Sequence, residues 1–427
     1  MSYRSNYLFL LAVSIGLAFT SCNRNVPLTA PDMEYITNQT RLLTEEMEKI
    51  VPAYAPEEKF TDTVYSVGPM AAPRSVRDGK LFTVPSRDWT SGFFPGNLWF
   101  MFELTGDAFW KQKAIEFTSR IEREKLNDGT HDMGFKINCS FGNGFRLTGD
   151  TRYREIMVES ATTLMKRFNP VVGATLSWGA IRQWGDTLTA EDHEAKWLFP
   201  VIIDNMMNLE LLFLATAFTG DSTYYHAAVK HAETTMKHHY REDNSSYHVI
   251  DFNPITGEVR NKHTHQGAAH ESAWARGQAW GLYGFTMCHR FTGKPEFLQQ
   301  AEKIAEFLIH HPNLPEDLVP YWDYDAPSIP DEPRDASAAA LIASALYELS
   351  TFLPEKSDSY KTMADRIHSS LSKSYYNAPG ANYGFILDHS TGHLPGDHEI
   401  DGPLIYADYY YLEAELRKRQ LQAASVK

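Results

Sequence analysis

Cysteine and positive charge are both scarce in this sequence. The chain has 3 Cys among 427 residues, which excludes a small scaffold held together by disulfides. It has 40 Lys and Arg against 54 Asp and Glu, giving a formal charge of −14, and no run of basic residues interrupts this balance. No nucleic-acid partner is therefore expected. An anionic ligand would have to be bound by a few local cations and by helix N-termini.

Long apolar runs are missing as well, apart from one near the N-terminus. Arg4 precedes an apolar stretch at residues 8–19, which is too short to cross a bilayer, and the small residues Thr20 and Ser21 lead to Cys22. Residues 1–22 resemble a bacterial lipoprotein signal, whose cleavage would leave Cys22 as a lipidated first residue. An ordinary secretory signal is the alternative. We expect an exported bacterial protein, periplasmic and attached to a membrane only through a lipid anchor at Cys22.

Cleavage there would leave two cysteines, Cys139 and Cys288. They could form one disulfide or remain two buried thiols. Both lie in apolar stretches with helical periodicity, which favours buried thiols.

Strand-like alternation and linker-like segments are also scarce. Alternation is confined to short pieces such as residues 247–250, and no Pro-, Gly- or Ser-rich stretch divides the chain. Residues 23–427 are therefore expected to form one domain.

Helical periodicity recurs in pairs instead. Four helix ends share the pattern of an aromatic or Leu, then Thr and Gly, at Gly106, Gly149, Gly220 and Gly293. Glycine suits the left-handed position after a helix, and in the first three an Asp follows that can cap the next helix. These are tight helix-to-helix turns. The expected helices span 31–51, 91–105, 107–125, 132–148, 150–168, 200–219, 222–240, 270–292, 294–311, 335–352, 357–374 and 403–418.

Six helical hairpins in succession predict an all-α fold, an (α/α)6 barrel with alternating inner and outer helices; a helical solenoid is the competing arrangement. The connections alternate in length, and the long ones lead into the helices expected at 91, 132, 200, 270, 335 and 403. In a barrel these connections would emerge at one end. Long loops in a compact domain are usually functional, so we expect the pocket there.

Asp204 is the first candidate for catalysis. It lies among Ile202, Ile203, Met206 and Met207, and such desolvation raises the pKa of a carboxyl toward the range useful for proton donation. The alternative is that Asp204 only caps the following helix. Pro200 argues against this, because proline prefers the first turn and would place Asp204 one turn inside the helix.

A second carboxylate stands in the connection His131-Asp132-Met-Gly-Phe135. Near a helix N-terminus the helix dipole would stabilise the Asp132 anion. One ionised and one protonated carboxyl group are what acid–base chemistry on a glycoside needs. The alternative for Asp132 is again a helix cap. Asp88, in another connection, is interpreted as a cap rather than a catalytic group.

Histidines and tryptophans crowd the connection at residues 261–280. We reject a metal site there, because a His-x-His loop without a companion Cys or Glu pattern is a weak signal, and we expect no cofactor. Arg276, between Trp274 and Trp280, is interpreted as a cation that binds a carboxylate in forked fashion, with an interhelical salt bridge as the alternative. Trp89 offers a flat face to a sugar. Arg334 and Asp335 are interpreted as a structural pair.

Several separate motifs, in this order, resemble the unsaturated glucuronyl hydrolases of glycoside hydrolase family 88, and the likeness runs over nearly the whole mature chain. The motifs are Trp89-Thr-Ser-Gly-Phe-Phe-Pro-Gly96, His131-Asp132-Met-Gly-Phe135, Ile203-Asp204-Asn-Met-Met-Asn208, His265-Gln266-Gly267, Trp274-Ala-Arg276-Gly-Gln278-Ala-Trp280 and Asp408-Tyr-Tyr-Tyr-Leu-Glu413.

The resemblance implies an exo-acting enzyme that removes a 4,5-unsaturated uronic acid from the non-reducing end of lyase-generated oligosaccharides, with glycosaminoglycan fragments the expected substrates. It implies that Asp204 donates the proton and activates water, and that Asp132 is its partner carboxylate. It assigns sugar contacts to Trp89, His131, His248, Gln266, Trp274, Arg276 and Trp280, and no metal.

Other functions stay open at this point. The related unsaturated rhamnogalacturonyl hydrolases share the fold. A non-catalytic glycan-binding lipoprotein would also present aromatic platforms, and a polysaccharide lyase can occupy the same barrel.

Overall fold

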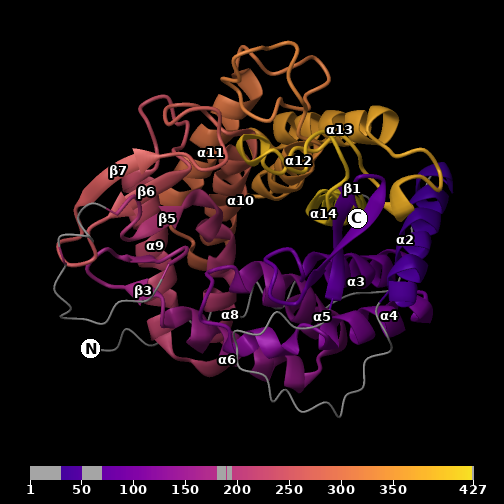
Figure 1. The fold of residues 1–427 in the computed structure, drawn as a ribbon, viewed down its shortest axis with the longest axis horizontal. Coiled ribbons are helices and arrows are strands. Elements are labelled where there is room, and N and C mark those ends of the chain that lie inside the picture. Colours follow the sequence, from indigo (N-terminus) through magenta and orange to yellow (C-terminus); the bar gives the residue numbers. More distant parts are fainter. Residues whose placement is uncertain (1–29, 51–69, 180–188, 190–194, 426–427) are drawn as a thin grey trace.

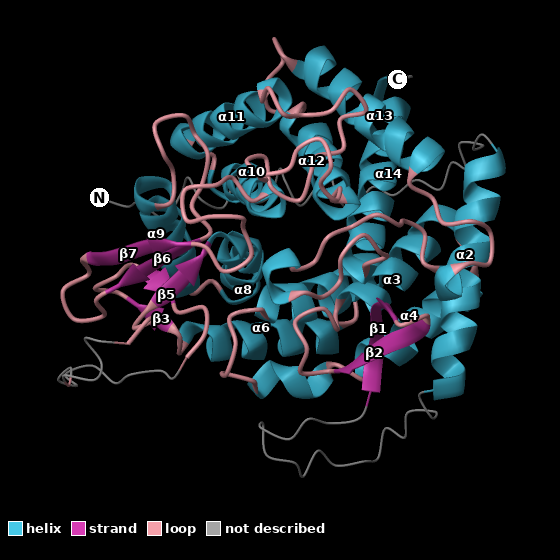
Figure 2. Ribbon diagram, turned by 45° about the horizontal axis from the view of Figure 1, so that its top comes forward, coloured by secondary structure: helices cyan, strands magenta, loops and turns pink. Residues whose placement is uncertain are grey.

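A computed structural model describes residues 30–50, 70–179, 189 and 195–425. The expected signal segment and Cys22 lie outside these residues. The helices form a ring in which an inner set is surrounded by an outer set, and loops cross one end of the ring (Figure 1, Figure 2).

Each inner helix follows one of the long connections. The inner elements are α3 (Phe93–Thr105), the π-helix η2 (Gly134–Gly142) continued by α5 (Asn143–Thr148), the 3-10 helix η3 (Ile203–Asn208) continued by α8 (Leu209–Thr219), α10 (Ala275–Thr292), α12 (Ala336–Leu349) and α14 (Ile405–Ser425).

The outer helices return along the outside of this ring. They are α2 (Ala30–Ile50), α4 (Ala108–Ser119), α6 (Thr151–Met165), α9 (Ser222–His238), α11 (Pro295–His310) and α13 (Ser357–Ser374). Short 3-10 helices lie between elements at η1 (Glu122–Leu126), η4 (Asn382–Gly384) and η5 (Leu394–Gly396).

The inner ring is closed. Contacts run from α3 to η2, from η2 to α8, and on through α10, α12 and α14, and α14 then contacts α3. A solenoid would leave its first and last helices apart, so this alternative is wrong and the (α/α)6 barrel is confirmed. One apolar core runs between the two rings, from Met33 to Leu416.

The expected turn chemistry is present at every short connection. Gly106, Gly149, Gly220 and Gly293 all adopt left-handed backbone angles with φ between 66° and 75°. Asp107, Asp150 and Asp221 each cap the next helix by accepting a hydrogen bond from a backbone amide two residues on. The local sequence is therefore sufficient to form the short turns between paired helices.

The helix expected at 200–219 needs correction. Pro200 does not begin a helix: residues Pro200–Ile202 form strand β5, and the helical segment starts at Ile203. β5 is recruited into a sheet by β6 (Val249–Phe252), which pairs with β7 (Val259–His263). This tertiary pairing overrides the local preference of proline for a helix start.

The remaining strands form two small hairpins. β1 (Met70–Arg77) pairs with β2 (Lys80–Pro85), and β3 (Phe168–Asn169) pairs with β4 (Ala174–Thr175). In Figure 2 the β5–β6–β7 sheet and the β1–β2 hairpin lie on opposite flanks of the helical ring.

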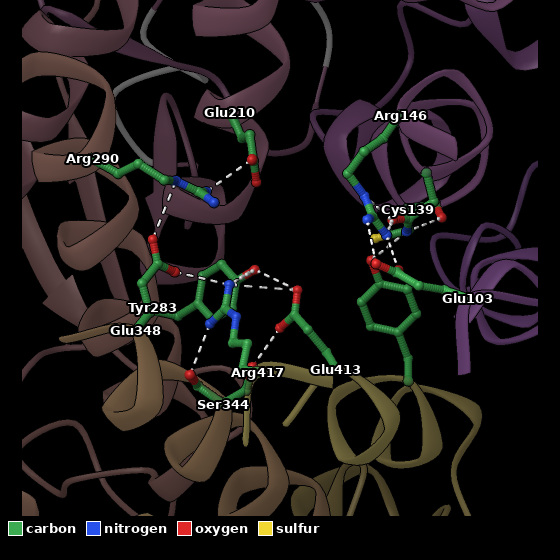
Figure 3. A network of polar contacts seen from close by, with 12 residues as sticks. Glu103, Cys139, Arg146, Glu210, Tyr283, Arg290, Ser344, Glu348, Glu413 and Arg417 are labelled. Carbon is green, nitrogen blue, oxygen red and sulfur yellow. Dashed lines mark hydrogen bonds and ion pairs between the residues drawn. The ribbon is translucent and has the colours of Figure 1, made fainter. Parts of the chain in front are cut away.

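Partly buried ion pairs join four inner helices, near the C-terminal ends of α10 and α12 (Figure 3). Arg290 on α10 pairs with Glu210 of α8 and Glu348 of α12, and Arg417 of α14 pairs with Glu348 and Glu413. We call these five residues the basal ion network. Because the long connections lie at the N-terminal ends of the same helices, the network and the predicted pocket occupy opposite ends of the barrel.

Cys139 and Cys288 are buried and free, which confirms the interpretation as buried thiols. Within the residues that the structure describes, no helix combines the length and apolarity that a membrane crossing requires.

Candidate active site

Pairing of β5 with β6 brings Asp204 to His248. Ile202 pairs with Val249, and the amide of Ile203 donates a hydrogen bond to the carbonyl oxygen of His248 over 3.0 Å. The Nε2 atom of His248 then lies 3.6 Å from the Oδ2 atom of Asp204. His248, which the sequence placed only by spacing, stands directly beside the first catalytic candidate.

Asp204 is desolvated as expected. Burial raises the pKa of Asp204 from 3.8 to about 7; the positive charge of Arg276 lowers it and the charge of Asp132 raises it. Its side chain makes no cap for η3 or α8, so the cap alternative is wrong. Among the described residues, Asp204 Oδ2, His248 Nε2 and Trp280 Nε1 are all buried without a hydrogen-bond partner. Such a group of orphaned polar atoms is typical of a site that takes a polar ligand.

The backbone fixes the tautomer of His248. Its Nδ1 atom accepts hydrogen bonds from the amides of His265 and Gln266, at 3.1 and 3.0 Å. An atom that accepts two N–H groups carries no proton, so the neutral ring carries its proton on Nε2. Burial lowers the pKa of His248 well below its usual value. The ring therefore presents an N–H donor toward Asp204.

Asp132 is held by its neighbours in the loop. Its Oδ2 atom accepts a hydrogen bond from the Thr130 hydroxyl over 2.7 Å, and its Oδ1 atom lies 3.2 Å from His131 Nε2. Burial lowers the pKa of His131, while the charge of Asp132 opposes that shift. The Asp132 carboxylate is thus near both a hydroxyl and an imidazole.

Asn208, not Asp132, satisfies the start of η2. Its Oδ1 atom accepts the amide of Gly134 at 2.8 Å and that of Phe135 at 3.3 Å. A Cβ at Gly134 would lie 2.6 Å from the Cα of Asn208, so only glycine permits this approach. The cap alternative for Asp132 is wrong, and the contact ties the segment of Asp132 to the segment of Asp204.

Arg276 occupies the interhelical ion pair that stood as its alternative. Its guanidinium is buried and donates from Nη1 to Asp335 Oδ2 at 2.8 Å and to the carbonyl of Thr391 at 2.6 Å. Nη2 donates to the carbonyl of Gly392 at 2.5 Å. The guanidinium of Arg276 is therefore already hydrogen-bonded to acceptors of the protein itself. Its charge still acts on Asp204, and binding of a substrate carboxylate by Arg276 stays a prediction.

The three tryptophans line the site but expose little surface. Trp280 is fully buried, Trp274 is 2 % exposed, and Trp89 is half-buried. Trp89 and Trp280 both pack on Phe135, with ring centroids 5.4 and 5.1 Å away, and the tilted rings of Trp274 and His248 have centroids 4.6 Å apart. These tryptophans are packed among other rings and are not open platforms.

Gln266 connects the site to the last loop. Its Nε2 atom donates to the carbonyl of Gly392 over 3.1 Å. On the other side of that loop, Glu399 is held by Arg74 and Arg77 of β1 at 2.6 and 3.1 Å. The β1–β2 hairpin and α10 thus hold the last loop in place next to Asp204.

Two further assignments are resolved by the structure. Arg334 pairs with Asp317 at 3.0 Å, while Asp335 pairs with Arg276, so the expected Arg334–Asp335 pair is wrong. Asp88 does not cap α3, whose first turn has no side-chain cap, so the cap interpretation is wrong; Asp88 instead accepts from the amide of Thr90 and from Arg74. In the part of the chain that the structure describes, no three His, Cys, Asp or Glu side chains gather closely enough to hold a metal ion.

Sequence reasoning missed the contribution of Asn208. It was visible as a polar residue in an apolar segment, but its partner amides lie 74 residues away along the chain. No sequence signal pointed to the Tyr406 ring, which stacks 5.0 Å from Trp89 and carries the Arg276 guanidinium 5.4 Å from its centroid.

A family model described as Glycosyl Hydrolase Family 88 matches residues 71–413, which include both carboxylates and all the pocket walls. The chain belongs to this family. It is therefore a glycoside hydrolase.

Relatives of this family 88 chain carry consistent names. It is 45% identical to an unsaturated glucuronyl hydrolase of Formosa agariphila, over 97% of this chain and 98% of that protein. It is 33% identical to an unsaturated chondroitin disaccharide hydrolase of Streptococcus pyogenes, over 80% of this chain and 84% of that protein. A crystal structure of an unsaturated glucuronyl hydrolase specific for heparin superposes with a TM-score of 0.80 at 43% identity, covering 91% of this chain and 98% of that one.

Proposed function

We propose that this family 88 enzyme removes a 4,5-unsaturated uronic acid from the non-reducing end of oligosaccharides produced by polysaccharide lyases. One observation carries the proposal. A single buried carboxyl group, Asp204, has a pKa of about 7 and faces a cluster of orphaned polar atoms, with a second carboxylate, Asp132, close enough to influence it.

The chemistry follows from that carboxyl group. Protonated Asp204 donates its proton to C4 of the vinyl ether, and positive charge develops at C5 and the ring oxygen. Water attacks C5 and gives its proton back to the Asp204 carboxylate. The resulting hemiketal opens and releases the remaining oligosaccharide, so one water is consumed and Asp204 is regenerated.

Surrounding groups support this cycle. The Asp132 carboxylate stabilises the positive charge that develops on the sugar. His248 directs its Nε2–H toward Asp204 and the substrate. Arg276 keeps part of the Asp204 population able to ionise, because its charge lowers the pKa of that carboxyl. Trp89, Trp274 and Trp280 exclude water from the unsaturated ring.

Glycosaminoglycan fragments are the substrates we propose. The names of two relatives, one chondroitin disaccharide hydrolase and one heparin-specific enzyme, support this class. The last loop has no Lys or Arg between Leu387 and Asp401, which disfavours a sulfate group next to that loop. The unsaturated rhamnogalacturonyl hydrolase function is the second candidate.

We also propose export and a lipid anchor at Cys22, supported by the sequence of residues 1–22. Metabolic labelling with a fatty acid should mark the wild type and not Cys22→Ser. Equal labelling of both would remove the anchor from the proposal.

Ultraviolet absorbance of the conjugated uronate tests the activity. Wild type, incubated with unsaturated disaccharides from several glycosaminoglycans and from rhamnogalacturonan, should erase the band for at least one glycosaminoglycan. Asp204→Asn should erase none. Asp408→Asn is the matched control, because Asp408 is also buried with a pKa of about 7 but accepts only backbone amides, so it should retain activity.

The other possible results of this absorbance experiment would each favour a different function. Loss of the band with the rhamnogalacturonan fragment alone would favour the second candidate. A rise in absorbance on intact polymer would make the protein a lyase. Binding without any absorbance change, unaffected by Asp204→Asn, would make it a glycan-binding protein.

A further inference from the structure

Arg167 lies at the end of α6 and is buried, with 2 % of its surface exposed. Its side chain donates to three backbone carbonyls. Nε donates to Leu176 at 2.8 Å, Nη1 to Asp128 at 2.7 Å and Nη2 to Gly179 at 3.3 Å. A buried guanidinium that donates its hydrogen bonds to neutral acceptors is uncommon, since burying a charge is costly unless another charge balances it.

The three acceptors belong to two chain segments that position the carboxyl groups of the candidate active site. Asp128 precedes Asp132 by four residues in the loop that carries it. Leu176 and Gly179 lie in the segment after β4, and that segment in turn holds the Asp204 region: the carbonyl of Thr175 accepts from Asn205 Nδ2 at 2.8 Å, and Ser177 Oγ accepts from the amide of Ile202 at 3.0 Å. One side chain therefore joins the loop of Asp132 to the segment that positions Asp204.

The charge of Arg167 points to the same role. Within residues 30–50, 70–179, 189 and 195–425, no carboxylate lies within ion-pair distance of its guanidinium, although the charges of Asp132 and Asp128 both act on it. Burial lowers the pKa of Arg167 to about 10, so the group is still a cation at neutral pH. The attraction between this cation and Asp132 adds to the hydrogen bonds that hold the loop.

We propose that Arg167 is a positioning residue for the pair Asp132 and Asp204: its hydrogen bonds hold together the two segments that position these carboxyl groups. This inference rests on the proposed function, because it concerns how that reaction's two carboxyl groups are arranged.

Other charged groups near Asp132 have to be separated from Arg167. His131 lies 3.2 Å from Asp132, and Asp204 acts on it from η3. Lys136, on the same segment, is paired with Glu124 at 3.2 Å. The charge of Arg167 also lowers the pKa of His131, so the test has to separate the loss of that charge from the loss of the hydrogen bonds.

Two substitutions separate the charge from the hydrogen bonds. Arg167→Gln removes the charge, and Arg167→Lys keeps it but cannot reach three carbonyls. Arg146→Gln is the control: Arg146 is paired with Glu103 at 2.5 Å near the C-terminal ends of α3 and α5, far from the connections that form the pocket. For each variant, kcat and KM are measured from pH 4 to 9 on the disaccharide that wild type hydrates best, together with thermal unfolding.

Arg167→Gln should lower kcat about 100-fold, as expected for misplaced catalytic groups, and move the alkaline limb of the kcat profile to lower pH, because a displaced Asp132 raises the pKa of Asp204 less. Arg167→Lys, which keeps the charge but loses hydrogen bonds, should lower kcat and move the alkaline limb in the same direction. Arg146→Gln should lower the unfolding temperature without moving either limb.

An alkaline limb that stays in place in Arg167→Gln, or a kcat no lower than that of Arg146→Gln, would overturn the inference while leaving the proposed function intact. Failure of both Arg167 variants to fold would make it a folding residue and would also overturn the assignment. A wild type inactive on every disaccharide would refute the proposed function, and this inference would fall with it.

Discussion

His248 Nε2 and Asp204 Oδ2 lie 3.6 Å apart, with neither atom hydrogen-bonded to any other described group. Two backbone amides donate hydrogen bonds to Nδ1 of the imidazole, so the proton of the neutral ring is on Nε2. The ring is thus a fixed donor facing the carboxyl group and cannot serve as a base. The base in the reaction has to be a carboxylate.

Replacing His248 with Phe should lower kcat about 100-fold, the loss typical of removing one donor from a catalytic centre. Phe keeps the ring that stacks on Trp274 but loses the N–H that stabilises the Asp204 anion. The pKa of Asp204 should then rise, so the alkaline limb of the kcat profile should move to higher pH.

His368→Phe is the control for that variant. His368 is also buried and stacks on an aromatic ring, 4.5 Å from Tyr411, but it lies on the outer helix α13. Its replacement should leave the alkaline limb unchanged. Equal limbs in wild type and His248→Phe would contradict the donor role.

The wild-type enzyme should show a bell-shaped dependence of kcat on pH. Asp204 has to be protonated to donate, and burial raises its pKa to about 7, so activity should fall as the pH rises through 7. Activity should also fall in acid, because Asp132 has to be a carboxylate. Initial rates at saturating substrate from pH 4 to 9 measure this directly. A flat profile across that range would rule out Asp204 as the acid.

Much of the fold could be predicted because the residues that end one helix and begin the next are adjacent in the sequence. Gly106 or Gly220 ends a helix and the next residue caps another within one tetrapeptide, so no tertiary information is needed. The alternation of short and long connections then located the pocket. The start of α8 could not be predicted, because β5 exists only through its pairing with β6, nearly 50 residues away.

The desolvation of Asp204 could be predicted for the same reason: its apolar neighbours surround it in the sequence itself. The partners of Arg276 could not. Asp335 and Gly392 lie 59 and 116 residues further along the chain, and a buried Arg has the same sequence signature whether it binds a ligand or the protein. Arg167 carries no motif, since its acceptors are backbone carbonyls, which every residue has.

Asp408 should make the protein less stable as the pH rises. Burial raises its pKa from 3.8 to about 7, so between these values the folded state holds a proton that the unfolded state releases. Stability from this group is therefore present below about pH 4 and lost as the pH rises through 7. Asp408→Asn cannot titrate, so between pH 4 and 8 its stability should improve relative to wild type by up to about 4 kcal/mol.

Urea unfolding at pH 4, 6 and 8 measures this difference. Asp221→Asn is the control: the amide and hydroxyl of Thr223 lower the pKa of Asp221, so this group is ionised in both states above about pH 4 and its difference from wild type should stay constant from pH 4 to 8. A constant difference between wild type and Asp408→Asn at all three pH values would mean that Asp408 is not protonated in the folded protein.

The basal ion network should stabilise the closed ring without contributing to catalysis. Glu348 lies between Arg290 and Arg417, at 3.2 and 2.8 Å, and its carboxylate is 10 % exposed (Figure 3). Glu348→Gln would leave two partly buried guanidinium groups short of a counter-charge, and losing such charged hydrogen bonds should cost about 1.5–3 kcal/mol. The free energy of unfolding in urea should fall by that amount, while kcat at low temperature should stay near that of wild type because the pocket lies at the other end of the barrel.

Asp358→Asn is the control. It breaks an i,i+3 pair with Lys361 in which the Asp side chain is 97 % exposed, and it should have no measurable effect on stability. If Glu348→Gln were as stable as Asp358→Asn, the ring would be held closed by its apolar core alone.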